Sequence, residues 1–210
     1  MTKTKRLGAE ISELSLPFSV RATQRIITDY SVNIWDSLEN LTDVEEAIFV
    51  LGMAEEHDTV TINLNCDGGS LYVGTAILQG MRTCRAPVHV VASGRVASFA
   101  TFILLNADSF EIDPYTEILC HSAAFGSAGK MTDTLQHTQF TYAQCKKLLH
   151  SEYEVFLTED EINHIIDSKY EHYMDVEEFI TRYERRNEFL QSKLQDEVEE
   201  FDPEYDADYS

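Results

Sequence analysis

Two apolar runs meet at Gly94-Arg95-Val96-Ala97-Ser98-Phe99-Ala100, and the fold is best predicted outward from this junction. Residues 88–92 before it are apolar and largely β-branched, as in a buried strand, whereas residues 98–106 are apolar almost all round, as in a buried helix. A serine at the start of such a helix lies near unpaired backbone N–H groups and the positive end of the helix dipole, which stabilise an anionic intermediate. The junction therefore predicts that Ser98 is a nucleophile.

Two further segments follow strand-like runs in the same way. Asp67-Gly68-Gly69-Ser70 comes after the alternating apolar and polar residues 59–65, and Cys120-His121-Ser122 closes the strand-like run 116–120. Each piece also has an ordinary structural explanation, because Gly-Gly-Ser is a common turn, a small serine lets helices pack, and a histidine can cap a strand. Taken together, the three segments indicate serine hydrolysis.

Each segment has a chemical role in such a site. The N–H of Phe99 would face the developing oxyanion, and Gly69 would supply a second donor because a glycine lets substrate approach the backbone closely. His121 would take the Ser98 proton and return it to the leaving amine. Cys120 is not the expected nucleophile, because neighbouring side chains in a strand point to opposite faces and Cys120 would then lie in the core.

Strand-like and helix-like runs alternate along most of the chain. The alternation predicts an α/β fold with a parallel sheet, built from stacked strand-strand-helix units with the connecting helices outside. Two capping boxes, Thr42 with Glu45 and Thr158 with Glu161, are expected to begin helices. Strands are expected at 25–30, 59–65, 88–92, 110–112 and 116–120, and helices at 42–57, 71–81, 98–106, 132–156 and from 158. The long polar helix over 132–156 does not suit a core, so we expect it to project and to pack against another chain.

Composition limits the domain organisation and the partners. The 210 residues, 43% of them hydrophobic, are enough for one domain with additional segments at its two ends. We expect an arm over 1–20, one domain over 21–190, and an acidic, disordered tail over 191–210. A formal net charge of -21 argues against a nucleic-acid partner, because a phosphate-tracking surface needs clustered Lys and Arg.

Cysteine, histidine and apolar patterns exclude other classes. The four cysteines, Cys66, Cys84, Cys120 and Cys145, show no C-x-x-C spacing and are expected to be reduced and buried. The helical histidines show no H-E-x-x-H spacing, so no metal site is predicted. Neither a signal-peptide pattern nor an apolar run long enough to span a bilayer is present, which leads us to expect a soluble cytoplasmic protein with no membrane partner.

Four segments, 64–74, 88–105, 118–124 and 126–133, resemble the proteolytic subunit of the Clp protease, a serine peptidase with a crotonase-like fold. The resemblance covers about residues 20–180, and its best motif is residues 94–100, similar to the family's Gly-x-x-Ala-Ser-x-x nucleophile segment. It implies that Ser98 is the nucleophile and His121 the base, with Gly69 and Phe99 as oxyanion donors and Gly68 in the same substrate-binding turn.

The resemblance also assigns the segment after the histidine. Residues 126–130, with Gly126 and Gly129, match the glycine-rich strand that holds the substrate peptide and leads into the family's handle helix. The handle would occupy about 127–157 and would dock one ring of subunits onto another.

Three departures from the family pattern concern the acid, the loop after the base and the C-terminal part. Matching the family's aromatic-aliphatic pair to Tyr173-Met174 places Glu171 where the family has aspartate; Asp167 and the more distant Asp175 are the alternatives. The chain reads Ser-Ala after His121 where the family usually has Gln-Pro. Residues 179–186 continue as a polar helix where the family closes with a Gly-Leu-Ile/Val-Asp strand.

The resemblance implies a serine endopeptidase subunit that hydrolyses unfolded polypeptide inside a chamber. The chamber would be one or two heptamer-like rings, with the N-terminal arm near the axial pore and an AAA+ unfoldase as the partner. The chain carries no G-x-x-x-x-G-K-[ST] phosphate loop, so any ATP would be used by that partner, and no cofactor is expected in the chain itself. The alternatives are a non-catalytic subunit that keeps the fold as a scaffold, and a crotonase-type acyl-CoA enzyme, which needs no Ser-His pair.

Overall fold

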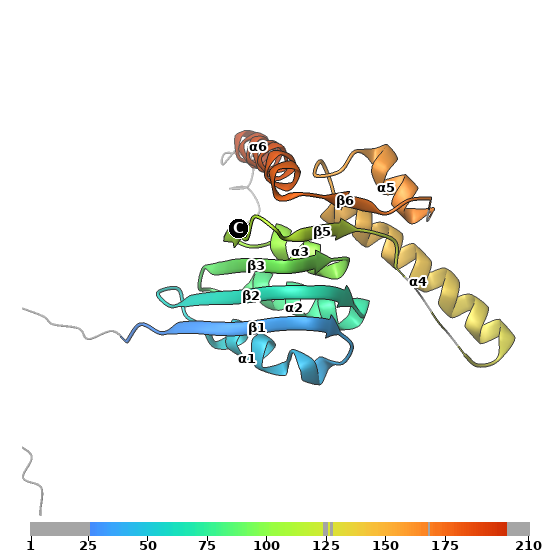
Figure 1. Cartoon of the computed structure of the whole chain (residues 1–210), viewed down its shortest axis with the longest axis horizontal. Coiled ribbons are helices and arrows are strands. Elements are labelled where there is room, and N and C mark those ends of the chain that lie inside the picture. Colours follow the sequence, from blue (N-terminus) through green and yellow to red (C-terminus); the bar gives the residue numbers. More distant parts are fainter. Residues whose placement is uncertain (1–25, 124–125, 127, 168, 201–210) are drawn as a thin grey trace, which may run out of the picture.

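The structure is a computed structural model that describes residues 26–123, 126, 128–167 and 169–200 (Figure 1). The predicted arm over 1–20 lies outside the described residues. In chain order the elements are β1 (Asp29–Leu38), the short 3-10 helix η1 (Leu41–Asp43), α1 (Glu45–Met53), β2 (Thr59–Gly69), α2 (Leu71–Thr83), β3 (Val88–Ala97), α3 (Phe99–Leu105), β4 (Ser109–Ile112), β5 (Glu117–Cys120), α4 (Met131–Glu152), α5 (Glu159–Ile166), β6 (His172–Met174) and α6 (Val176–Glu200).

One mixed sheet organises these elements. Its order is β1-β2-β3-β5-β6, and β4 pairs with β3 beside β5. The pairings among β1 to β5 are parallel, while β6 runs antiparallel to β5. The predicted α/β fold with a parallel sheet is therefore confirmed. Figure 1 shows α5 and α6 at the β6 end of the sheet, away from β1 and α1 at the other end.

The core lies where β2, β3 and α3 meet. Apolar residues of β2 and β3 alternate into the core, with Ile62 and Val90 fully buried. All seven residues of α3 are buried, as the all-round apolar sequence predicts. This packing fixes the start of α3, where Ser98 lies.

Three strands run past their predicted ends; β2, predicted over 59–65, continues to Gly69. The strand predicted over 25–30 is shifted: residues 26–28 precede β1, which runs from Asp29 to Leu38. As an edge strand with only two buried residues, β1 carries polar residues that weaken the strand signal. β3 continues past the predicted end at residue 92 to Ala97, through the exposed residues 93–95 and a positive φ of 68° at Gly94. The extension of β3 brings the sheet directly to Ser98.

The two predicted capping boxes have different outcomes. Thr158 and Glu161 form theirs, with the Glu161 N–H donating to Thr158 Oγ1 at 3.2 Å and the Thr158 N–H donating to Glu161 Oε2 at 2.7 Å. The box predicted for Thr42 and Glu45 is wrong, because Asn40 and Asp43 form a capping box at η1 instead and α1 begins after Val44. That helix ends at Met53, short of the predicted residue 57.

α4 leaves the body of the molecule, as expected for residues 132–156, although it ends at Glu152. Only Leu149 and Glu152 of this helix are buried, and Figure 1 shows it extending beyond the sheet.

The C-terminal helix corrects one expectation: we predicted disorder over 191–210, whereas α6 continues through Glu200 and only 201–210 lie outside the described residues. Among the described helices none is long and apolar enough to cross a membrane.

All four cysteines are free thiols, as predicted, but only two are fully buried. Cys66 and Cys120 lie in the core, whereas Cys84 and Cys145 are half-buried. Burial raises the pKa of the Cys120 thiol to about 12. Cys120 is therefore an inert core residue and not a competing nucleophile, as its strand position indicates.

Candidate active site

Ser98 occupies a strained turn between β3 and α3. Its backbone has φ 55° and ψ -124°, a conformation that costs a non-glycine residue about 1–3 kcal/mol. The Ser98 N–H donates to Leu119 O of β5 at 2.8 Å, which ties the turn to the neighbouring strand. A sharp strand-to-helix turn of this kind presents the hydroxyl of its central serine at the edge of a sheet. The residues before and after Ser98 are buried, while Ser98 itself is partly exposed.

Gly68 lies directly against this turn. A Cβ added to Gly68 would lie 2.6 Å from Ser98 Cβ and 2.8 Å from Phe99 N, and the φ of +85° also favours glycine. Its own N–H donates to Cys66 Sγ at 3.3 Å. Gly68 thus permits the close approach of β2 to the serine turn, while its amide is already hydrogen-bonded.

The next residue, Gly69, packs against β1. A Cβ added to Gly69 would lie 2.6 Å from Leu38 O, and its φ is +139°. The following amide, Ser70 N–H, donates to Leu38 O at 2.8 Å. Phe99, on the opposite side of the turn, is the first residue of α3, so its N–H has no partner within the helix.

The register of β5 and β6 brings His121 and Glu171 together. The antiparallel pairs are Ile118 with Met174, Leu119 with Tyr173 and Cys120 with His172. One step beyond the last pair, His121 lies opposite Glu171, and directly opposed side chains of antiparallel strands are close neighbours. His121 Nδ1 and Glu171 Oε1 are 3.9 Å apart, and the two side chains are 30% and 55% exposed.

The other candidate acids are engaged elsewhere. Asp167 binds Lys169 Nζ at 2.7 Å, and that hydrogen bond lowers the pKa of the Asp167 carboxyl. The Asp175 carboxylate accepts the Glu178 N–H at 2.9 Å and so caps α6. Of the three sequence candidates, Glu171 is the one beside His121.

Ser98 and His121 line one groove of about 480 Å³. Gly68, Gly69 and Gly126 line it too, whereas Gly129 is absent from its described lining and faces Thr134. Among the described residues no hydrogen bond joins Ser98 Oγ to His121; catalytic hydrogen bonds are often long without substrate and tighten when it binds. The groove also carries the carboxylates of Glu39 and Asp67, and Arg95 pairs with Asp67 at 3.4 Å.

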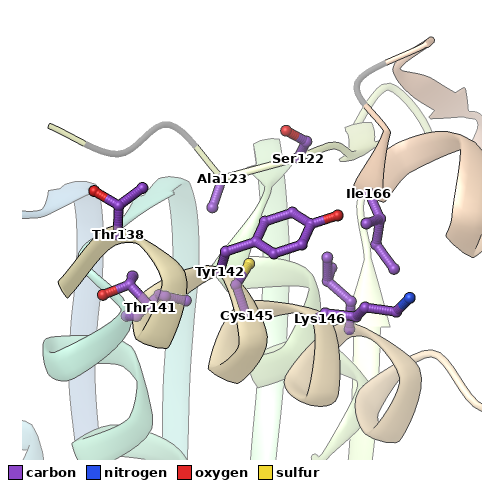
Figure 2. A pocket seen from close by; sticks show the side chains of 10 residues that line it. Ser122, Ala123, Thr138, Thr141, Tyr142, Cys145, Lys146 and Ile166 are labelled. Carbon is purple, nitrogen blue, oxygen red and sulfur yellow. The ribbon is translucent and has the colours of Figure 1, made fainter. Parts of the chain in front are cut away.

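A second cavity, of about 180 Å³, adjoins this groove (Figure 2). The two share Leu71, Ala123 and Thr141 in their linings. Figure 2 shows the Tyr142 ring, from α4, lying between Ala123 and Ile166. The remaining lining residues are Ser122, Thr138, Cys145, Lys146 and Leu149. This mainly apolar cavity was not predicted, because its walls come from four separate parts of the chain: α2, the segment after β5, α4 and α5.

Sequence comparisons place this geometry in a family. The family model described as Clp protease matches residues 18–182. The chain belongs to the Clp protease family. The match confirms the resemblance inferred for about residues 20–180, and it makes the α/β sheet with a projecting α4 the Clp protease fold.

The curated relatives are ATP-dependent Clp protease proteolytic subunits at low identity. One from Pleurastrum terricola is 29% identical over 48% of this chain and 53% of its own length. Subunit 1 from Shouchella clausii (strain KSM-K16) is 25% identical over 60% of this chain and 67% of its own length. One from Chlorella vulgaris is 30% identical over 42% of this chain and 45% of its own length. The matches thus span about half to two thirds of these relatives, and the low identities mark this chain as a divergent family member.

No part of the described chain gathers three or more His, Cys, Asp or Glu side chains in a way that could hold a metal ion. The groove itself presents the Ser98 hydroxyl, the His121 imidazole and backbone amides, and Glu171 lies beside His121.

Proposed function

We propose that the chain is a serine endopeptidase subunit in which Ser98 is the nucleophile, His121 the general base and Glu171 the acid that orients the base. The observation that carries this proposal is the contact of 3.9 Å between Glu171 Oε1 and His121 Nδ1, just beyond the paired residues of β5 and β6, with His121 lining the same groove as Ser98. Triads of this kind are defined by geometry and roles and accept either aspartate or glutamate as the acid.

In this mechanism Ser98 Oγ attacks the carbonyl carbon of the scissile peptide bond. His121 removes the hydroxyl proton and passes it to the leaving amine as the C–N bond breaks, which leaves an acyl ester on Ser98. His121 then deprotonates a water that attacks the ester and releases the acid and free Ser98. Glu171 faces His121 Nδ1, which leaves Nε2 for the proton transfers.

Two backbone amides are suited to the oxyanion. The Phe99 N–H is unpaired at the start of α3, and the helix dipole adds to its effect. Amides of consecutive strand residues alternate in direction, and Ser70 N–H points to β1, so the Gly69 N–H is expected to face the Ser98 side. Gly68 contributes close approach and not a donor, because its N–H is bonded to Cys66 Sγ.

The adjoining cavity is suited to a side chain of the polypeptide substrate. Its walls are mainly apolar and it is continuous with the groove through Leu71 and Thr141, so it favours an apolar side chain beside the cleaved bond. Gly126 lines the groove on the same side and is where the substrate backbone would lie.

Assembly would enclose this site. α4 exposes large apolar side chains, with Met131, Leu135 and Tyr142 along one side of the helix and Phe140 on the opposite side. Exposed apolar residues in such number are typical of a helix that contacts another chain. We propose that this handle joins subunits into heptamer-like rings or a double ring in the cytoplasm, that an AAA+ unfoldase feeds polypeptide into the chamber, and that ATP is used only by that partner.

One observation favours a second candidate, a scaffold subunit with weak or no activity. The 3.9 Å between His121 Nδ1 and Glu171 Oε1 is longer than a hydrogen bond, and the described part of the chain shows no Ser98–His121 hydrogen bond. The acyl-CoA alternative has no such support, since none of the described groove residues is a Lys or Arg that would bind nucleotide phosphates.

Intact-mass analysis after treatment with a fluorophosphonate separates the two candidates. The probe is applied to assembled wild type, Ser98→Ala and His121→Ala, with Ser70→Ala as the control because Ser70 also lines the groove. One adduct on wild type and on Ser70→Ala, lost in Ser98→Ala and His121→Ala, supports the peptidase. An assembled ring that gains no adduct and cleaves no peptide would support the scaffold.

A further inference from the structure

Tyr173 binds the carboxylate that faces His121. Its phenol O–H donates to Glu171 Oε2 at 3.0 Å, while the other oxygen, Oε1, is the one nearest His121 Nδ1. The two oxygens of Glu171 thus have separate partners. This contact is not implied by the sequence, in which Tyr173 serves only to align the chain with the family's aromatic-aliphatic pair.

Strand geometry explains how the contact forms. Glu171 and Tyr173 are two residues apart, so their side chains lie on the same face of the β6 strand direction, while His172 between them points to the other. On that other face His172 Nε2 lies 3.2 Å from Glu178 Oε1 of α6. His172 therefore fixes the strand to α6, and Tyr173 fixes the carboxylate on the side of His121.

Glu171 needs such support more than an aspartate would. Its side chain has one more rotatable bond than aspartate and is 55% exposed, so without a second partner the carboxylate would sample many positions in solvent. A charge-assisted hydrogen bond from the phenol of Tyr173, two residues further along the chain in β6, removes much of that freedom. The hydrogen bond to Glu171 also raises the pKa of the Tyr173 phenol.

We propose that Tyr173 is a positioning residue that holds the Glu171 carboxylate toward His121 and so compensates for glutamate at the acid position. The proposal rests on the proposed function, because it assigns Tyr173 a part in the activation of Ser98 through Glu171 and His121. Tyr173 itself touches neither substrate nor the reacting atoms.

The test is a double-mutant cycle on the rate of Ser98 acylation by a fluorophosphonate. The variants are Tyr173→Phe, Glu171→Gln and the two combined, with Tyr115→Phe as the matched control because Tyr115 is 91% exposed on the turn before β5. Tyr173→Phe removes only the hydroxyl, so we expect acylation to be about 3- to 10-fold slower. This is the effect expected when one charge-assisted hydrogen bond is lost that acts on Ser98 only through Glu171 and His121. Once Glu171 is Gln, removing the Tyr173 hydroxyl should cost nothing more.

Peptide hydrolysis supplies a second readout. A residue that positions the acid should lower kcat and leave KM unchanged, because it does not contact the substrate. Circular dichroism and size-exclusion chromatography establish that each variant is folded and assembled like wild type.

The failures are distinguishable. Acylation of Tyr173→Phe at the wild-type rate would overturn the positioning role, and so would additive losses in the double variant, while Ser98-dependent labelling of wild type left the proposed function intact. If assembled wild type and Ser98→Ala were equally unlabelled, the proposed function would be wrong and the role of Tyr173 with it.

Discussion

The two halves of the candidate site are built by different means. The nucleophile half, where β2, β3 and α3 meet, is shaped by backbone contacts in the core: Gly68 lies against Ser98, and Phe99 is buried. The acid half depends on two partly exposed side chains, His121 just after β5 and Glu171 just before the three-residue strand β6. Backbone packing tolerates no extra atom, whereas exposed side chains can be exchanged for others that reach the same place. The acid half is therefore where this chain can depart from its family without losing the fold.

The largest effect is expected from Gly68→Ala in the nucleophile half. The new Cβ would lie within 3 Å of Ser98 Cβ, Ala97 O and Phe99 N, at a φ that L residues rarely adopt. We expect the serine turn to be displaced, with Ser98 acylation by a fluorophosphonate reduced about 100-fold or more and stability lowered by about 1–3 kcal/mol.

Gly52→Ala is the matched control for that substitution. Gly52 is in α1 with open space around its Cβ position, so alanine there should leave acylation unchanged and stabilise the helix by about 0.5–1 kcal/mol. Chemical denaturation and the labelling rate measure both effects. Equal labelling of Gly68→Ala and wild type would mean that the close approach of β2 does not shape the site.

In the acid half, Glu171→Gln is expected to have a smaller effect. The amide keeps the size of the side chain but loses the charge that stabilises the protonated His121. Because the pair is partly exposed and 3.9 Å apart, we expect acylation to slow about 10- to 100-fold, less than for a buried acid.

Asp167→Asn is the control for the acid. Its carboxylate is bound to Lys169, so the rate should stay within about twofold of wild type. A slow Asp167→Asn variant beside a normal Glu171→Gln variant would reverse the assignment of the acid.

A more modest effect should come from filling the cavity beside the groove. Cys145→Phe places a ring in a space of about 180 Å³ between α4 and the segment after β5 (Figure 2). We expect KM to rise about 3- to 10-fold for peptides with a large apolar residue at the cleaved bond, since one filled subsite removes about 1 kcal/mol of binding. Labelling by a small fluorophosphonate should not change. An unchanged KM for every apolar side chain tested would show that the substrate does not use this cavity.

The residues of the nucleophile half could be predicted from the sequence because each lies in a short segment with a recognisable local pattern. Ser98, Phe99 and the two glycines lie in short segments between apolar runs, and the apolar character of α3 predicts its burial. The acid half was less accessible, because residues 172–174 carry no strand signal of their own and pair with β5 across more than fifty residues of chain. The interpretation of Glu171 therefore needed the family resemblance, which left Asp167 and Asp175 open, and the geometry now favours Glu171.

Two other features escaped prediction for related reasons. The edge strand β1 is too exposed to show its full length as alternation, and only residues 25–30 were predicted. The Tyr173–Glu171 contact and the cavity of Figure 2 depend on how distant elements pack, and no spacing in the sequence encodes either.

The smallest effect on activity at neutral pH is expected from the Glu161–Arg182 ion pair between α5 and α6, which should be lost only at acid pH. Partial burial by itself raises the pKa of Glu161, but hydrogen bonds from Arg182 and Thr158 overcome it and lower that pKa to about 2. Arg182 of α6 reaches Glu161 of α5 at 2.9 Å, so this ion pair joins the two helices that flank β6. A carboxyl with a lowered pKa in the folded state contributes stability that is full above its unfolded pKa of about 4.3 and is lost as the pH falls toward 2. We expect the thermal midpoint of wild type to fall over that interval more steeply than that of Glu161→Gln, which lacks the titrating group. If the two curves ran parallel from pH 5 to pH 2, the Glu161–Arg182 ion pair would not couple α5 to α6.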